Sequence, residues 1–129
     1  MPAAKEMPAA PRTVAVIGAS NAREKFGNKA VRAYLRQGWT VYPVNPNERE
    51  VEGLPAYPSI TDIPGPVTRA TLYLPPEVGL RVLDGIKAKG VTELYVNPGA
   101  ESDDLMTRAE ALGLDPIWAC SIVDIGERP

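Results

Sequence analysis

A short polar loop, formed by Gly18, Ala19 and Ser20, carries the residues of this chain that are best suited to bind an anion. It follows an apolar run at residues 14–17 and precedes a segment, residues 30–35, whose apolar residues recur at helical spacing. A turn between a buried strand and a helix presents unpaired backbone N–H groups and the positive end of the helix dipole. We therefore interpret this loop as a phosphate cradle. The alternative is that Gly18 only ends a strand, because the dinucleotide pattern G-x-G-x-x-G is incomplete and the next glycine is Gly27.

Basic residues lie close to this loop in the sequence. Lys25 flanks it, together with Arg23 and Lys29, and Arg49 follows a second apolar run. Nicotinamide and flavin proteins with strand-turn-helix phosphate loops commonly place an acidic residue at the end of the second strand, where it binds the ribose hydroxyls. This chain has Asn45 at that position. A neutral amide tolerates a ribose phosphate that a carboxylate would repel. The pattern favours a ligand with several phosphates, and the alternative is that these cations are ordinary solvated side chains.

No set of residues typical of catalysis accompanies the loop. The chain has no histidine and one cysteine, which excludes an internal disulfide, the usual zinc sites and a Ser-His-Asp triad. Cys120 follows the last predicted strand on the expected ligand side, and its two interpretations are a reactive thiol and an inert buried residue. We expect a binding protein that is not an enzyme and holds no metal.

Composition predicts one domain over residues 13–129, preceded by a flexible arm at residues 1–12 with three prolines. The formal net charge of -2 disfavours nucleic acid and anionic membrane surfaces as partners. No apolar run reaches the roughly 20 residues of a membrane helix, and the N-terminus lacks the apolar core of a signal peptide. We therefore expect a cytoplasmic protein.

Strand and helix patterns alternate along the chain. Strands are predicted at residues 14–17, 39–44, 70–74, 91–96 and 116–119, with helices at 28–37, 76–89 and 103–112 between them. Leu35 and Met106 are expected on the buried stripes of the first and third helices. Pro43 places the second strand at or near a sheet edge. The alternation predicts an α/β, Rossmann-like doubly wound fold, with a mainly parallel sheet of about five strands and helices on both faces.

Ligand residues are then expected on the loops that follow the strands. Five such stretches resemble, in order, those of the small stand-alone CoA-binding proteins, which are similar to the N-terminal CoA-binding domain of the succinyl-CoA synthetase α subunit. They are VAVIGAS with the delayed Phe26-Gly27, VYPVNP, GLPAYPSITDIP, YLPPE and YVNPGAES. The resemblance covers residues 13–121 and implies a Rossmann-type fold that holds coenzyme A (CoA), with its adenosine near the second strand and its pyrophosphate by the first loop.

Carried over residue by residue, the resemblance implies the following contacts. Gly18, Ala19 and Ser20 lie at the diphosphate or pantetheine, Asn45 and Pro46 at the adenosine, Leu74 and Pro75 beside the pantetheine, and Asn97, Pro98 and Gly99 across the cleft. Synthetases pass a phosphate through a histidine in a second domain, so their chemistry is not expected in a chain without histidine.

Three hypotheses follow from the sequence. The first is a non-catalytic module that binds CoA or an acyl-CoA, with a mixed disulfide at Cys120 only if the pantetheine thiol reaches it. The second is an NADP-binding oxidoreductase subunit, which the fold and the neutral Asn45 would allow. The third is an interaction domain that keeps the fold without a ligand.

Overall fold

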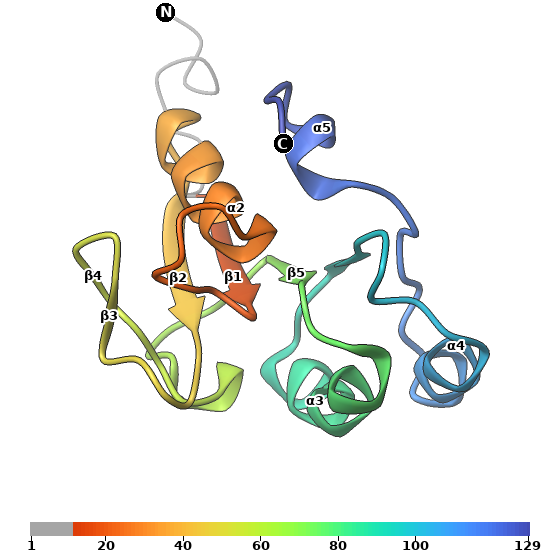
Figure 1. Ribbon diagram of the computed structural model, residues 1–129. Helices are drawn as coiled ribbons and strands as arrows, with labels where there is room; N and C mark the ends of the chain where they lie inside the picture. The colour runs from red at the N-terminus through yellow and green to blue at the C-terminus, as the bar shows by residue number, and fades with distance from the viewer. Residues whose placement is uncertain (1–11) are drawn as a thin grey trace, which may run out of the picture.

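A parallel sheet of four strands runs through the molecule, whose computed structural model describes residues 12–129 (Figure 1). The strands lie in the order β2 (Thr40–Val44), β1 (Thr13–Ile17), β5 (Arg69–Leu72) and β6 (Glu93–Val96). All pairs are parallel, and β1, fully buried, lies between β2 and β5. The arm predicted at residues 1–12 falls outside the described residues except for Arg12.

Alternation along β1 divides the core into two layers. Ala15 and Ile17 point toward one layer, and Val14 and Val16 point toward the other. This two-sided burial explains why the strand reads as a continuous apolar run.

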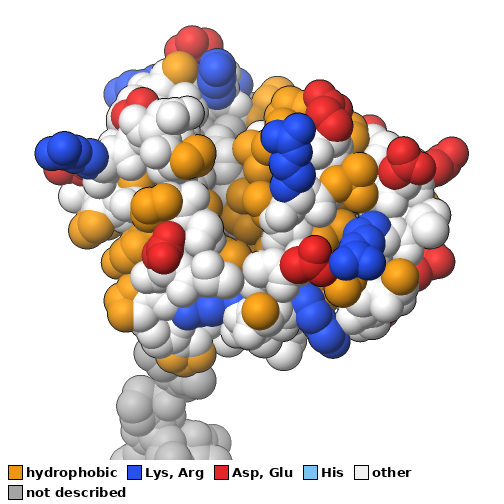
Figure 2. Space-filling model, turned by 90° about the horizontal axis from the view of Figure 1, so that it is seen from below, with side chains coloured by type: hydrophobic (Ala, Val, Ile, Leu, Met, Phe, Trp, Pro, Cys, Tyr) orange, Lys and Arg blue, Asp and Glu red, His pale blue; other side chains and the backbone are white. Residues whose placement is uncertain are grey.

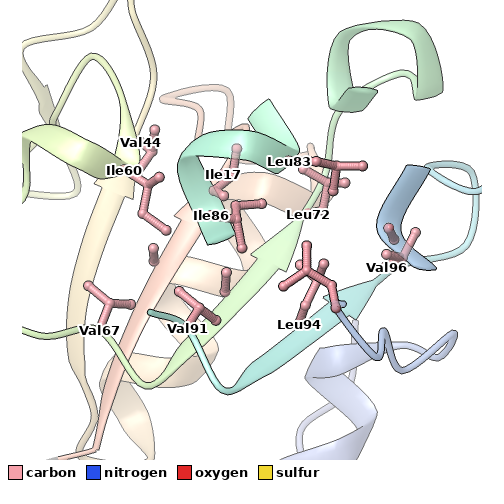
Figure 3. Close-up of a cluster of buried hydrophobic side chains, with 14 of the residues drawn as sticks. Ile17, Val44, Ile60, Val67, Leu72, Leu83, Ile86, Val91, Leu94 and Val96 are labelled. Carbon is pink, nitrogen blue, oxygen red and sulfur yellow. The ribbon is translucent and has the colours of Figure 1, made fainter. Parts of the chain in front are cut away.

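The first layer is covered by α3 (Pro76–Lys89), α4 (Asp103–Ala111) and the short 3₁₀ helix η1 (Ile60–Asp62). The buried side chains that fill it come from all four strands, from these helices and from loop residues such as Val67 and Val91 (Figure 3). The second layer is covered by α2 (Phe26–Arg36) and α5 (Ser121–Asp124). Helices therefore cover both faces of a mainly parallel sheet, as the Rossmann-like prediction requires.

Several element boundaries differ from the sequence prediction. Helix α2 begins at Phe26, two residues before the predicted start. The predicted fifth strand at residues 116–119 is wrong, because only Ile117 forms a bridge, to Tyr95 of β6. Leu35 and Met106 are exposed, since the buried stripes of their helices pass through neighbouring positions instead.

Strand β2 lies at an edge of the sheet, as Pro43 predicted, and a single bridge covers part of that edge. Tyr57 bridges Val44, donating its N–H to the Pro43 carbonyl and accepting from the Asn45 N–H, both at 2.9 Å. The segment before it forms a small antiparallel pair of β3 (Glu50–Val51) and β4 (Leu54–Pro55). This connection brings η1 over the carboxyl end of β2.

At the amino ends of the strands, Arg69 of β5 connects α5 to the sheet. Its guanidinium donates to Asp124 at 2.9 Å and to Glu93 at 3.2 Å, and it lies over the rings of Trp39 and Tyr95. Burial alone would lower the pKa of Arg69, but the hydrogen bonds to Glu93, Tyr34 and Asp124 raise it overall. Arg69 therefore stays charged and structural, away from the carboxyl ends of the strands.

Candidate functional site

The carboxyl ends of the strands are hollowed into two adjoining compartments. Figure 2 views the molecule from this end and shows a recess in which apolar side chains are visible. The first hollow, of about 530 Å³, lies between the loop after β2, η1 and α3. The second, of about 460 Å³, lies between the start of α2 and the loops after β5 and β6. Gly18 and Leu74 line both hollows, so the two meet at the first loop.

Two glycines fix the shape of this junction. Gly18 has φ +94°, and a Cβ built on it would lie 2.5 Å from the Tyr73 carbonyl oxygen. A Cβ on Gly27 would lie 2.1 Å from the Gly18 carbonyl oxygen. The delayed second glycine of the sequence pattern therefore lets α2 start directly against the first loop. A side chain at either position would collide with the backbone of this chain. Replacing Gly18 with a branched residue would therefore disturb the fold, and a loss of binding would not show that Gly18 contacts a ligand.

The second hollow combines a helix N-terminus with apolar walls. The N-cap Lys25 and the first helical residues, Phe26 and Gly27, form the start of α2, whose leading N–H groups have no partner within the helix. This arrangement, with the Lys25 ammonium beside it, suits a phosphate. The remaining lining is largely apolar and includes Tyr73, Leu74, Pro75, Pro76, Pro98 and Ala100. Glu77 adds one negative charge to this rim.

Tyr73 presents its ring to the second hollow but buries its hydroxyl. Among the described residues this oxygen has no hydrogen-bond partner. Burial raises the pKa of the Tyr73 phenol. The group is therefore neutral and contributes an apolar wall.

The first hollow has an apolar floor and a mostly neutral polar rim. The apolar lining at the strand ends consists of Ile17, Val44 and Leu74, and α3 contributes Val78 and Val82. The polar members of the lining are Asn45, Asn47, Ser59, Thr61 and Arg81. Such a pocket suits a planar apolar group whose edges form hydrogen bonds.

Two asparagines act as braces between the loops. Asn45 donates to the Ala19 carbonyl and accepts from the Asn47 N–H, both at 2.7 Å. Asn97, which is buried, donates to Thr71 Oγ1 at 2.7 Å and to the Leu72 carbonyl at 2.9 Å, and it accepts from the Ser121 N–H at 2.9 Å. These amides hold the loops in place.

The structure brings together eight of the thirteen residues proposed from the sequence. Those lining the hollows are Gly18, Lys25, Asn45, Pro46, Leu74, Pro75, Pro98 and Gly99. The other five lie outside both linings: Ala19 is buried in the core, Ser20 Oγ accepts from the Ala22 N–H, Arg49 is exposed, Asn97 is the brace described above, and Cys120 packs half-buried against the second core layer.

Sequence reasoning missed the contribution of α3. Val78, Arg81, Val82 and Gly85 all line the first hollow. They recur at i, i+3, i+4 and i+7, so they form one face of the helix, beside the buried stripe that contains Leu83 and Ile86. The i, i+3, i+4, i+7 spacing was a readable signal of this face, whereas the sequence prediction placed ligand residues only on the loops after the strands.

Comparison with known proteins fits this geometry. Residues 12–125 match the family described as the CoA binding domain. The chain belongs to this family. It is 44% identical over 87 residues to the alpha subunit of an ADP-forming acetate–CoA ligase II from Pyrococcus furiosus, a match that spans 67% of this chain and 19% of that relative. The chain thus corresponds to a small part of the ligase subunit.

Solved structures of similar proteins share the fold of this chain. A conserved hypothetical protein from Pyrococcus furiosus aligns with a TM-score of 0.79 at 33% identity, covering 89% of this chain and 99% of that one. A dinucleotide-forming acetyl-coenzyme A synthetase 1 from Ca. Korarchaeum cryptofilum, solved with phosphate and ADP, aligns with a TM-score of 0.74 at 32% identity. That match covers 84% of this chain and 26% of the synthetase. The fold of this chain therefore occurs both as nearly the whole of a small protein and as part of a larger synthetase.

Proposed function

We propose that this protein binds CoA or an acyl-CoA across the two hollows, as a binding module without catalysis of its own. The observation that carries the proposal is the junction of the hollows at Gly18 and Leu74. CoA is a long ligand with an adenosine end, a central diphosphate and a pantetheine arm. Two consecutive compartments with an anion site where they meet suit a ligand of this shape.

The lining of each compartment supports this placement. The apolar floor and hydrogen-bonding rim of the first hollow suit the adenosine. The start of α2 at the junction suits the diphosphate, because its N–H groups and Lys25 are positive. The apolar walls around Phe26 and Pro98 suit the arm and any attached acyl group.

The described lining residues also support a role in binding alone. Lys25, Tyr73, Glu77 and Arg81 are the ionisable ones, and they do not form a pair of carboxylates or a nucleophile with its base. Across residues 12–129, no three His, Cys, Asp or Glu side chains gather as metal ligands would. In the same part of the chain, no helix is long and apolar enough to cross a membrane.

Titration calorimetry with CoA, acetyl-CoA, NADP and NAD tests the proposal. We expect saturable binding of CoA and acetyl-CoA at one molecule per chain, and no detectable binding of NAD. Val78→Trp should abolish CoA binding, because the ring would fill the first hollow. Met106→Trp places the same side chain on an exposed position of α4, outside both linings, and should leave binding unchanged. Saturable NADP binding without CoA binding would favour the oxidoreductase hypothesis instead.

A further inference from the structure

Arg81 stands apart from the other side chains of the first hollow. It is the one charged residue among the described residues that line it. Within residues 12–129 its guanidinium forms no ion pair or side-chain hydrogen bond, whereas two other charged residues of α3, Asp84 and Lys89, are engaged. Asp84 pairs with Arg108 at 2.8 Å, and Lys89 donates to the Ile63 carbonyl. An arginine that faces a pocket with its five donors uncommitted is suited to an anionic ligand group.

The surroundings of Arg81 favour an anion. The polar groups across the hollow, Asn47, Ser59 and Thr61, are neutral hydrogen-bonding side chains. Among the described lining residues of this hollow there is no carboxylate to neutralise the guanidinium or to repel a phosphate. Arg49, the cation that the sequence suggested for this end of the ligand, lies outside the lining. The favourable charge is thus supplied by α3, across the hollow from β2.

The two hollows each contain one cationic side chain at a separate place. Lys25 lies beside the N-terminus of α2 in the second hollow, and Arg81 lies on the far wall of the first. CoA likewise carries two separate anionic groups, the diphosphate and the 3′-phosphate on the ribose. We infer that Arg81 binds the 3′-phosphate, so that the site selects CoA over dephospho-CoA. This inference rests on the proposed function and adds a specificity-determining residue to it.

Calorimetry with CoA and dephospho-CoA, at low and high salt, tests the inference. Arg81→Gln removes the charge from an exposed side chain that forms no ion pair or side-chain hydrogen bond with the described residues, so the fold should be kept. Wild type should prefer CoA by about tenfold, the lower end of what a charge-assisted hydrogen bond provides at an exposed position. Arg81→Gln should remove this preference by weakening CoA alone, and the preference of wild type should shrink at high salt.

Lys87→Gln is the matched control. It removes the same charge from an exposed position of α3 that lines neither hollow, and it should leave both affinities unchanged. If Arg81→Gln weakens the two ligands equally, or weakens neither, the inference is overturned while CoA binding by wild type still upholds the proposed function. If wild type binds neither ligand, the proposed function fails together with the inference.

Discussion

The contact between Gly27 and the first loop gives a sharp stability prediction. A Cβ at Gly27 would lie 2.1 Å from the Gly18 carbonyl oxygen, whereas a carbon and a carbonyl oxygen normally approach to roughly 3.3 Å. The first turn of α2 or the cradle itself would have to move by about 1 Å to accept Gly27→Ala. Overpacking of this kind costs about 1–3 kcal/mol, and the upper part of the range applies because the obstacle is backbone.

Helix propensity acts in the opposite direction. Alanine is favoured over glycine within a helix by about 0.5–1 kcal/mol, so the net loss in the free energy of unfolding should be about 2 kcal/mol. Urea denaturation without ligand measures it. Gly85→Ala is the matched control, because its Cβ would meet only the methyl carbons of Ile60 and Thr61, at 3.5 Å. That variant should gain about 0.5–1 kcal/mol. A Gly27→Ala variant as stable as wild type would refute the close packing of α2 on the first loop.

Three further predictions test the braces and the thiol. Asn45→Asp replaces the N–H group that donates to the Ala19 carbonyl with a carboxylate oxygen, which cannot donate. Without ligand, this change should lower the free energy of unfolding by about 1–2 kcal/mol. Unchanged stability in urea would show that this brace is unimportant. Asn97→Ala removes three buried hydrogen-bonding contacts and should cost about 2–4 kcal/mol in the same assay, and a loss below about 1 kcal/mol would contradict its assigned role. Cys120 lies outside both linings, so incubation of the folded protein with CoA disulfide should give no adduct when the intact mass is measured. The unfolded protein should be labelled at Cys120. An adduct on the folded protein would place the pantetheine thiol at Cys120.

Local patterns predicted most of the fold because local physics determines it. Pro76 begins α3 at the first helical position, where proline lacks only an N–H that would have no partner, and Ser102 caps α4 by accepting from the Leu105 N–H. The fifth strand failed for a nonlocal reason. Residues 116–119 are rich enough in apolar side chains to resemble a strand, but only Ile117 reaches the ladder of β6.

The candidate site was only partly predictable. Residues at strand ends, such as Gly18, Pro46 and Leu74, were found because parallel strands bring their carboxyl ends to one edge. The carbonyl that accepts from Asn45 belongs to Ala19 on another loop, and the face of α3 that carries Arg81 closes the first hollow only after the crossover packs. Tertiary contacts of this kind cannot be assigned from residue type alone.

The central claim, that one elongated ligand occupies both hollows, is tested most directly by titrating the ¹⁵N-labelled protein with CoA and with its two halves. CoA should shift the amide resonances of Asn47 and Thr61 in the first hollow and of Lys25 and Ala100 in the second, all with one dissociation constant, while exposed Val123 on α5 stays unmoved. Adenosine 3′,5′-bisphosphate should shift mainly the first pair, and pantetheine mainly the second. Shifts confined to one hollow under saturating CoA, or a pattern centred away from both, would contradict the account.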